Sequence, residues 1–251
     1  MRIPRRQANQ KKAIPGDDLI FVKVREALSF GGCPICWLAN RAAQRFLDGF
    51  LYERVNDPGA RKEFLTSRGF CLHHAWALQQ FYDAFGVAIV YRHLLQELLQ
   101  ELRLFAERTP ISGFRRDARE SAARLRSALL PKRACPACEV ARSTEETALA
   151  ALLERLNDLE VQERLSTTSW LCLPHFQMGV AIAREATQIR RLAQIQVEVL
   201  QNIVGSLGEF IRKHDYRFSH EPITEEEATS WAQAIQMVVG RDPMEVRIRR
   251  R

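Results

Sequence analysis

The chain has 251 residues, of which 46% are hydrophobic and 27% charged, and its formal net charge is +7. This length allows one large domain or two small ones, and the apolar content, with four Trp and thirteen Phe, excludes a disordered chain. No run approaches the roughly 18 apolar residues of a membrane-spanning helix, and no secretory signal follows Met1, so we expect a cytoplasmic protein with reduced thiols and no membrane contact.

Apolar residues at helical spacing predict helices along most of the chain, whereas the alternation typical of strands is nearly absent. In chain order, the expected helices are 36–56, 60–66, 72–85, a long helix after Gly86, 116–129, 139–156, 186–214 and 225–239. The last one begins with Thr224 followed by Glu227, which is a capping-box pattern. A linker is expected at 108–113, where Pro110 and Gly113 break the helical pattern.

The same pattern occurs twice in the chain. Residues 51–74 and 152–175, offset by 101, share nine identities in 24 positions, and Cys33-Pro-Ile-Cys36 matches Cys135-Pro-Ala-Cys138 at an offset of 102. Chance does not place both parts of a split motif at nearly one offset, so an internal duplication is predicted. We expect an all-α fold of two tandem pseudo-symmetric helical repeats packed into one body, with two separate domains as the alternative.

All six cysteines lie in the duplicated motifs. Each copy supplies Cys-Pro-x-Cys and, about 34 residues later, Cys-x-x-His. A Cys-x-x-Cys turn brings two thiolates to one ion, and Cys-x-x-His at a helix start adds a sulfur and an imidazole to complete a tetrahedron. We therefore predict one Cys3His site per repeat, formed by Cys33, Cys36, Cys71 and His74 in the first and by Cys135, Cys138, Cys172 and His175 in the second.

Three thiolates and an imidazole favour zinc, with two Zn²⁺ ions per chain, and an iron–sulfur cluster is the second choice. Two other interpretations of the cysteines are weaker. Dithiol redox centres do not require Cys-x-x-His to recur with each Cys-x-x-Cys, and the strand–helix pattern of a thioredoxin-like fold is missing. A disulfide framework requires an oxidising compartment, which nothing in the sequence indicates.

The predicted sites have the composition of structural metal sites. Four protein ligands close the coordination shell, so that no position is left for water or substrate. In the first site His73 stands next to His74, where the second copy has Pro174, and either imidazole could be the ligand. The spacing favours His74.

A second polar cluster, Lys213-His214-Asp215-Tyr216-Arg217, follows the long helix of the second copy. One interpretation is structural, because basic residues at a helix C-terminus suit the helix dipole. The other is a pocket lined by His214, Asp215, Tyr216 and Arg217, with His73 as a further candidate, in which imidazole and carboxylate could transfer protons. No nucleophile motif, phosphate-binding loop or open metal-site motif is present, so no catalytic residue is predicted.

Positive charge is concentrated at the two ends. Residues 1–12 carry five positive charges and no negative one, and residues 241–251 carry five Arg against two acidic residues. Clustered Lys and Arg can neutralise nucleic-acid phosphates, which makes nucleic acid a possible partner of the two tails. The alternative is that both tails are simply solvated ends.

The doubled Cys-Pro-x-Cys and Cys-x-x-His motifs, with Lys213–Arg217 ahead of a Trp-bearing terminal helix that ends in Val-Val-Gly240, resemble an uncharacterised bacterial family. The resemblance covers roughly residues 17–241 and leaves out both basic tails. It implies a bacterial, cytoplasmic protein, and it implies no activity.

The sequence thus predicts a zinc-binding protein with two structural sites, most consistent with a non-enzymatic binding or adaptor protein that has an unknown protein partner. The alternatives are a nucleic-acid-associated regulator that uses its basic tails and an enzyme with a pocket around His214–Arg217. The predicted segments are a basic tail at 1–16, a first metal-binding repeat at 17–108, a second at 114–214, a C-terminal helical segment at 215–241 and a basic tail at 242–251.

Overall fold

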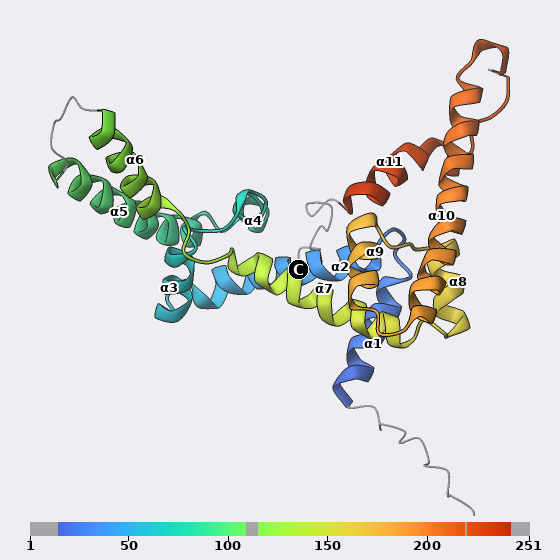
Figure 1. Ribbon diagram of the computed structural model, residues 1–251, viewed down its shortest axis with the longest axis horizontal. Helices are drawn as coiled ribbons and strands as arrows, with labels where there is room; N and C mark the ends of the chain where they lie inside the picture. The colour runs from blue at the N-terminus through green and yellow to red at the C-terminus, as the bar shows by residue number, and fades with distance from the viewer. Residues whose placement is uncertain (1–14, 109–114, 219, 242–251) are drawn as a thin grey trace, which may run out of the picture. The chain divides into compact units, whose positions relative to one another are not determined.

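The computed structural model describes residues 15–108, 115–218 and 220–241, and within these ranges every named element is helical, which confirms the all-α class (Figure 1). The α-helices are α1 (Pro15–Ala27), α2 (Pro34–Gly49), α3 (Pro58–Thr66), α4 (Leu72–Ala77), α5 (Ala84–Arg108), α6 (Arg115–Leu129), α7 (Pro136–Glu154), α8 (Leu159–Thr167), α9 (Leu173–Ile182), α10 (Ala186–Lys213) and α11 (Glu225–Val239). Three short elements complete the order: a π-helix η1 (Phe50–Arg54) and two 3₁₀-helices, η2 (Leu78–Phe81) and η3 (Tyr216–Phe218).

Most expected helices are present, with differences at their ends that have local causes. The expected helix at 72–85 is shorter, because α4 passes into η2 and Tyr82 then takes a left-handed conformation with φ of 56°. The next helix begins at Ala84 rather than after Gly86, since the Asp83 carboxylate accepts a hydrogen bond from the Gly86 backbone N–H at 2.8 Å. The capping box of Thr224 and Glu227 is present at the start of α11, whereas α1 was not predicted.

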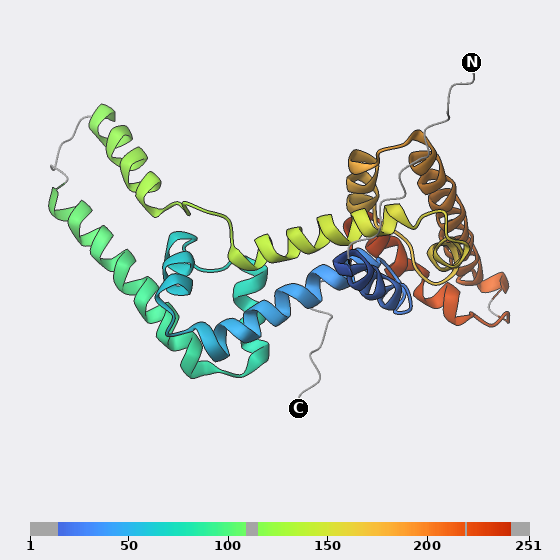
Figure 2. The ribbon, with the colours of Figure 1, turned by 90° about the horizontal axis from the view of Figure 1, so that it is seen from below.

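Two compact units divide the described chain. Unit 1 contains the chain up to Leu38 together with Glu145–Arg241, and unit 2 contains Ala39–Thr144. The division falls inside α2 and inside α7, each of which is a continuous helix (Figure 2). Each unit therefore combines parts of both sequence copies, in contrast to the repeats expected at 17–108 and 114–214.

Unit 1 has its core along α10. The predicted apolar stripe of this helix buries Leu192, Ile195, Val199 and Ile203. Helices α8, α9 and α11 all contact α10, and Figure 1 shows them gathered along it. Burying such a stripe, at about 1.5–3 kcal/mol per large aliphatic side chain, is the main stabilisation available to an amphipathic helix.

Unit 2 has an aromatic core. The rings of Phe50 and Phe64 both lie 5.2 Å from that of Phe70, edge to face. The predicted stripe of α5 is only partly buried here: Val90 and Leu94 are covered, while Leu95 is 60% exposed. Helix α6 contacts α5, and the two green helices run together in Figure 1.

No helix in the described ranges is both long and apolar enough to span a bilayer. The two basic tails lie almost entirely outside the described residues, as does most of the expected linker at 108–113. The nucleic-acid hypothesis that rests on the tails therefore stays a prediction.

Candidate metal centres

The eight predicted ligands gather in two groups of four. Within each group the potential ligand atoms all lie within 4.8 Å of one another. We call the two groups site A, formed by Cys33, Cys36, Cys172 and His175, and site B, formed by Cys71, His74, Cys135 and Cys138.

The ligands are paired differently from the prediction. Each site takes Cys-Pro-x-Cys from one sequence copy and Cys-x-x-His from the other, so the prediction that each repeat holds a site of its own is wrong. The cause lies in helix length. Helix α2 and the following η1 carry the chain roughly 30 Å away from Cys36. Helix α3 has nine residues and is less than half as long, so it does not bring the chain back to Cys36. The chain thus reaches Cys71 inside unit 2, where Cys135 arrives from the other copy.

All four motifs lie at helix N-termini. The two Cys-Pro-x-Cys motifs begin α2 and α7, whose first residues are Pro34 and Pro136. The two Cys-x-x-His motifs begin α4 and α9, whose N-cap residues are Cys71 and Cys172. Proline suits the first helical position because its fixed φ fits the turn and no N–H is needed there. The positive end of a helix dipole also favours a thiolate, so each site has two helix ends that stabilise its sulfur ligands.

Backbone hydrogen bonds bring the motifs of the two copies together. Near site A, the Trp170 N–H donates to the Gly32 carbonyl at 3.1 Å, beside an isolated parallel bridge between Gly32 and Ser169. Near site B, the Lys132 N–H donates to the Thr66 carbonyl at 2.9 Å. In both cases the segment before a Cys-Pro-x-Cys motif is tied to the segment before the Cys-x-x-His motif of the other copy.

In site A the imidazole faces three sulfur atoms. The His175 Nδ1 atom lies 3.4 Å from Cys33 Sγ, 3.3 Å from Cys36 Sγ and 3.1 Å from Cys172 Sγ. The sulfurs of Cys36 and Cys172 are 3.6 Å apart. All four residues are buried.

Site B has the same arrangement. The His74 Nδ1 atom lies 3.2 Å from Cys71 Sγ, 3.3 Å from Cys138 Sγ and 3.7 Å from Cys135 Sγ, and the Cys71 and Cys138 sulfurs are 3.5 Å apart. All four residues have intermediate burial, in contrast to site A. The neighbouring His73 is exposed and is not part of the group.

These separations fit a single tetrahedral ion. Zinc bonds of about 2.3 Å to sulfur and about 2.0 Å to nitrogen place two sulfurs about 3.8 Å apart and a sulfur and a nitrogen about 3.5 Å apart. The measured separations, from 3.1 to 3.7 Å, lie within a few tenths of an ångström of these values.

The charges of the sites also fit a cation. Burial raises the pKa of Cys138, and the negative charge of Cys135 raises it further, so three thiolates are not stable together without a compensating charge. Burial, with the charge of His73, lowers the pKa of His74 and keeps its imidazole neutral, as a metal ligand must be. At His175, burial acts to lower the pKa, but the hydrogen bonds that the imidazole donates to the surrounding cysteine sulfurs and to Glu145 outweigh it, and the pKa is raised.

Site A has a carboxylate beside its imidazole. Glu145 Oε1 lies 3.5 Å from His175 Nε2, on the side of the ring away from the sulfurs. A carboxylate in this position orients a metal-bound histidine and raises its basicity. The sequence did not point to Glu145, because it lies 30 residues before His175 and no local pattern connects the two residues.

The cluster around His214 makes local contacts. His214 Nδ1 lies 2.7 Å from the carbonyl of Phe210 on the same helix, and the Asp215 carboxylate accepts hydrogen bonds from Arg217, which lowers the pKa of Asp215. Tyr216 is 85% exposed. These contacts suit a helix C-terminus, and the pocket that was predicted around these residues stays a prediction.

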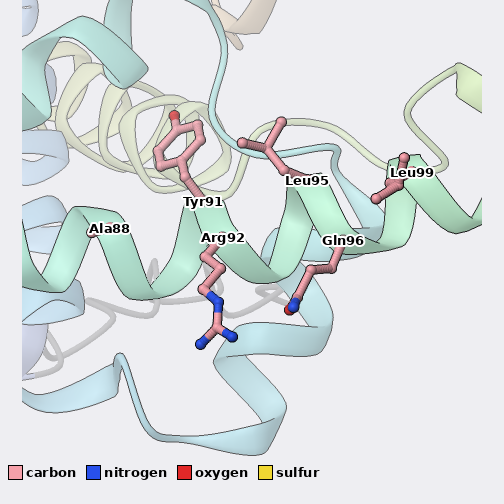
Figure 3. Close-up of a pocket in the computed structure, with 6 residues that line it drawn as sticks. All are labelled: Ala88, Tyr91, Arg92, Leu95, Gln96 and Leu99. Carbon is pink, nitrogen blue, oxygen red and sulfur yellow. The ribbon is translucent and has the colours of Figure 1, made fainter.

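A surface hollow lies elsewhere, on unit 2. Six residues of α5 line it. Figure 3 shows Tyr91 and Leu95 pointing to one side of this helix and Arg92 and Gln96 pointing to the other. None of the eight ligands of sites A and B lines this hollow. A wall formed by one helix does not enclose a ligand, so the two cysteine–histidine groups remain the best-defined chemical sites of the described chain.

Comparison with known proteins places the chain in a family. Residues 17–245 match DUF6062, a family of unknown function. A relative described as "Uncharacterized 23.9 kDa protein in xynA 3'region", from Caldicellulosiruptor sp. (strain Rt8B.4), is 26% identical over 209 residues, which cover 83% of this chain and 95% of the relative. No solved structure matches the chain. Because the match extends over most of the sequence, this protein belongs to the DUF6062 family.

Proposed function

We propose that the protein binds two zinc ions, one in site A and one in site B, and that both have a structural role in a non-enzymatic binding or adaptor protein. One observation carries the proposal: in each site, four donor atoms from distant parts of the chain lie within 4.8 Å of one another. In site A, Cys33 and His175 are 142 residues apart, and in site B, His74 and Cys135 are 61 residues apart. Side-chain packing alone does not explain why three sulfur atoms and one imidazole meet at two separate places in the chain.

The structural role follows from the number of protein donors. Three thiolates and one imidazole fill a tetrahedral shell and leave no open position for a substrate. Each ion would also join both sequence copies, so that its binding free energy adds to the folding free energy. For zinc in small finger domains this contribution is on the order of 10–16 kcal/mol.

Zinc is favoured over an iron–sulfur cluster by the size of the sites. A cluster places several iron and sulfide atoms among its ligands and holds the cysteine sulfurs further apart than one ion does. The Cys36 and Cys172 sulfurs, at 3.6 Å, are close enough to share a single ion. None of the six cysteines forms a disulfide bond, so all six sulfur atoms are available as ligands.

Elemental analysis of protein purified without a metal-affinity tag tests the proposal. We expect two zinc ions per chain and no stoichiometric iron or sulfide. Removal of zinc with a chelator should lower the helical signal in circular dichroism, and added zinc should restore it. Protein that is fully folded with no bound metal, or that contains iron with acid-labile sulfide, would contradict the proposal.

A further inference from the structure

The chain that follows α11 lies directly on the sulfur atoms of site A. The Arg241 backbone N–H donates a hydrogen bond to Cys36 Sγ at 3.4 Å, and the Arg241 guanidinium donates to the Gly31 carbonyl at 3.3 Å. A Cβ atom placed on Gly240 would lie 3.1 Å from Cys36 Sγ and 3.6 Å from Cys172 Sγ. The backbone of Gly240 and Arg241 therefore covers one face of site A.

Gly240 meets two requirements that other residues do not. Its φ and ψ of 88° and 178° fall in a region that is essentially restricted to glycine. The missing side chain also lets the backbone approach the two sulfurs. Its own N–H donates to the Gln236 carbonyl at 2.9 Å and ends α11, so the turn is fixed relative to the helix.

We propose that Gly240 and Arg241 belong to metal site A, and that the docking of α11 is coupled to the metal occupancy of that site. The Arg241 N–H donates to the Cys36 thiolate and withdraws negative charge from a metal-bound sulfur, as the outer partners of metal ligands do elsewhere. This inference rests on the proposed function, because it requires a metal ion in site A.

The other end of α11 is held by an ion pair. Lys213 Nζ, at the end of α10, lies 2.6 Å from Glu227 Oε1, and the two side chains are only 10% and 11% exposed. In the last turn of α11, Met237 is buried and accepts a hydrogen bond from Gln196 Nε2 at 3.0 Å. The first turn of α11 is thus anchored by an ion pair, whereas the residues that directly follow its last turn are anchored at site A.

A matched pair of substitutions at one position tests the proposal. Arg241→Pro removes the backbone N–H, whereas Arg241→Ala keeps it and removes only the side chain. We expect Arg241→Pro to lower the zinc affinity of site A by about tenfold. In cobalt-substituted protein it should also move the sulfur-to-metal charge-transfer band to lower energy. Arg241→Ala, which removes only the guanidinium contact with the Gly31 carbonyl, should have a clearly smaller effect in both measurements.

A second comparison avoids the introduction of proline, which could disturb the fold at position 241. Gly240→Ala should weaken site A, while Gly69→Ala, at the same φ of 88° but in unit 2, should not. Hydrogen exchange at 233–239 should be faster when site A is removed by Cys172→Ser than when site B is removed by Cys138→Ser. Exchange at 225–229 should change less.

The outcomes separate the two proposals. If the wild-type chain binds no metal, the proposed function fails. If it binds two ions but Arg241→Pro behaves as Arg241→Ala does, or if 233–239 exchange equally in both cysteine variants, the role of Gly240 and Arg241 is refuted and the metal sites stand.

Discussion

The sulfur of Cys36 lies 3.6 Å from that of Cys172, although 136 residues separate them in the chain. The prediction had paired Cys36 with Cys71, which is much closer in sequence. Because both sites cross between the copies, neither copy can bind a metal with its own ligands alone. Each ion would join parts of the chain that are far apart in sequence, and it would stabilise the folded state alone, because its ligands are gathered only there.

Paired cysteine substitutions distinguish the crossed arrangement from the one first predicted. Each of Cys33→Ser, Cys71→Ser and Cys172→Ser alone should lower the metal content by about one ion per chain. The double variant Cys33→Ser/Cys172→Ser should also lose about one ion, since both residues belong to site A. Cys33→Ser/Cys71→Ser should lose both ions. Elemental analysis measures the difference, and the reverse pattern in the two double variants would restore the pairing within each copy.

The two adjacent histidines of the first copy should behave differently. His74 Nδ1 lies within 3.7 Å of three sulfurs, whereas His73 is exposed and outside the group. We expect His74→Ala to lose about one ion and His73→Ala to retain two. Zinc content and the cobalt absorption spectrum report both effects. Loss of an ion in His73→Ala, with His74→Ala intact, would show that the other imidazole is the ligand.

The sequence indicated which residues gather in the two groups better than it indicated their pairing, for a physical reason. Residue type and short spacing are local properties, so Cys-Pro-x-Cys and Cys-x-x-His at helix starts could be recognised directly. The pairing depends on how far α2 carries the chain from Cys36 before it turns, and the sequence pattern does not reveal that path. The same holds for Glu145 and Arg241, which reach site A only through tertiary contacts. Helix α10, by contrast, was predicted almost to the residue, because its apolar stripe is long and regular.

Glu145 should strengthen zinc binding at site A. A metal on Nδ1 of His175 leaves the proton on Nε2, which can then donate to the Glu145 carboxylate at 3.5 Å. We expect Glu145→Ala to lower the zinc affinity of site A by about tenfold and Glu145→Gln to have a smaller effect, because the amide oxygen still accepts a hydrogen bond. Competition with a zinc-binding dye measures this, with Glu154→Ala, at the exposed end of the same helix, as the control. Equal affinities in the Glu145→Ala and control variants would contradict this role.

The ion pair of Lys213 and Glu227 should make the docking of α11 dependent on pH. The hydrogen bond from Lys213 and the one from the Thr224 backbone lower the pKa of Glu227. A carboxyl group with a lowered pKa in the folded state stabilises that state above its unfolded pKa of about 4.3, and the stabilisation is lost as the pH falls through the folded pKa.

Glu227→Gln keeps the capping box but removes the charge, so it isolates the contribution of the ion pair. At pH 7 we expect the variant to have a lower melting temperature than the wild-type protein and faster hydrogen exchange at 225–229. Both differences should shrink as the pH falls below the unfolded pKa of about 4.3, and they should be lost as it falls through the lowered pKa of Glu227 in the folded protein. Because the two proteins are compared at each pH, loss of metal in acid affects both alike. A difference that stayed constant down to the lowest pH at which both are folded would show that the pair contributes through packing and not through charge.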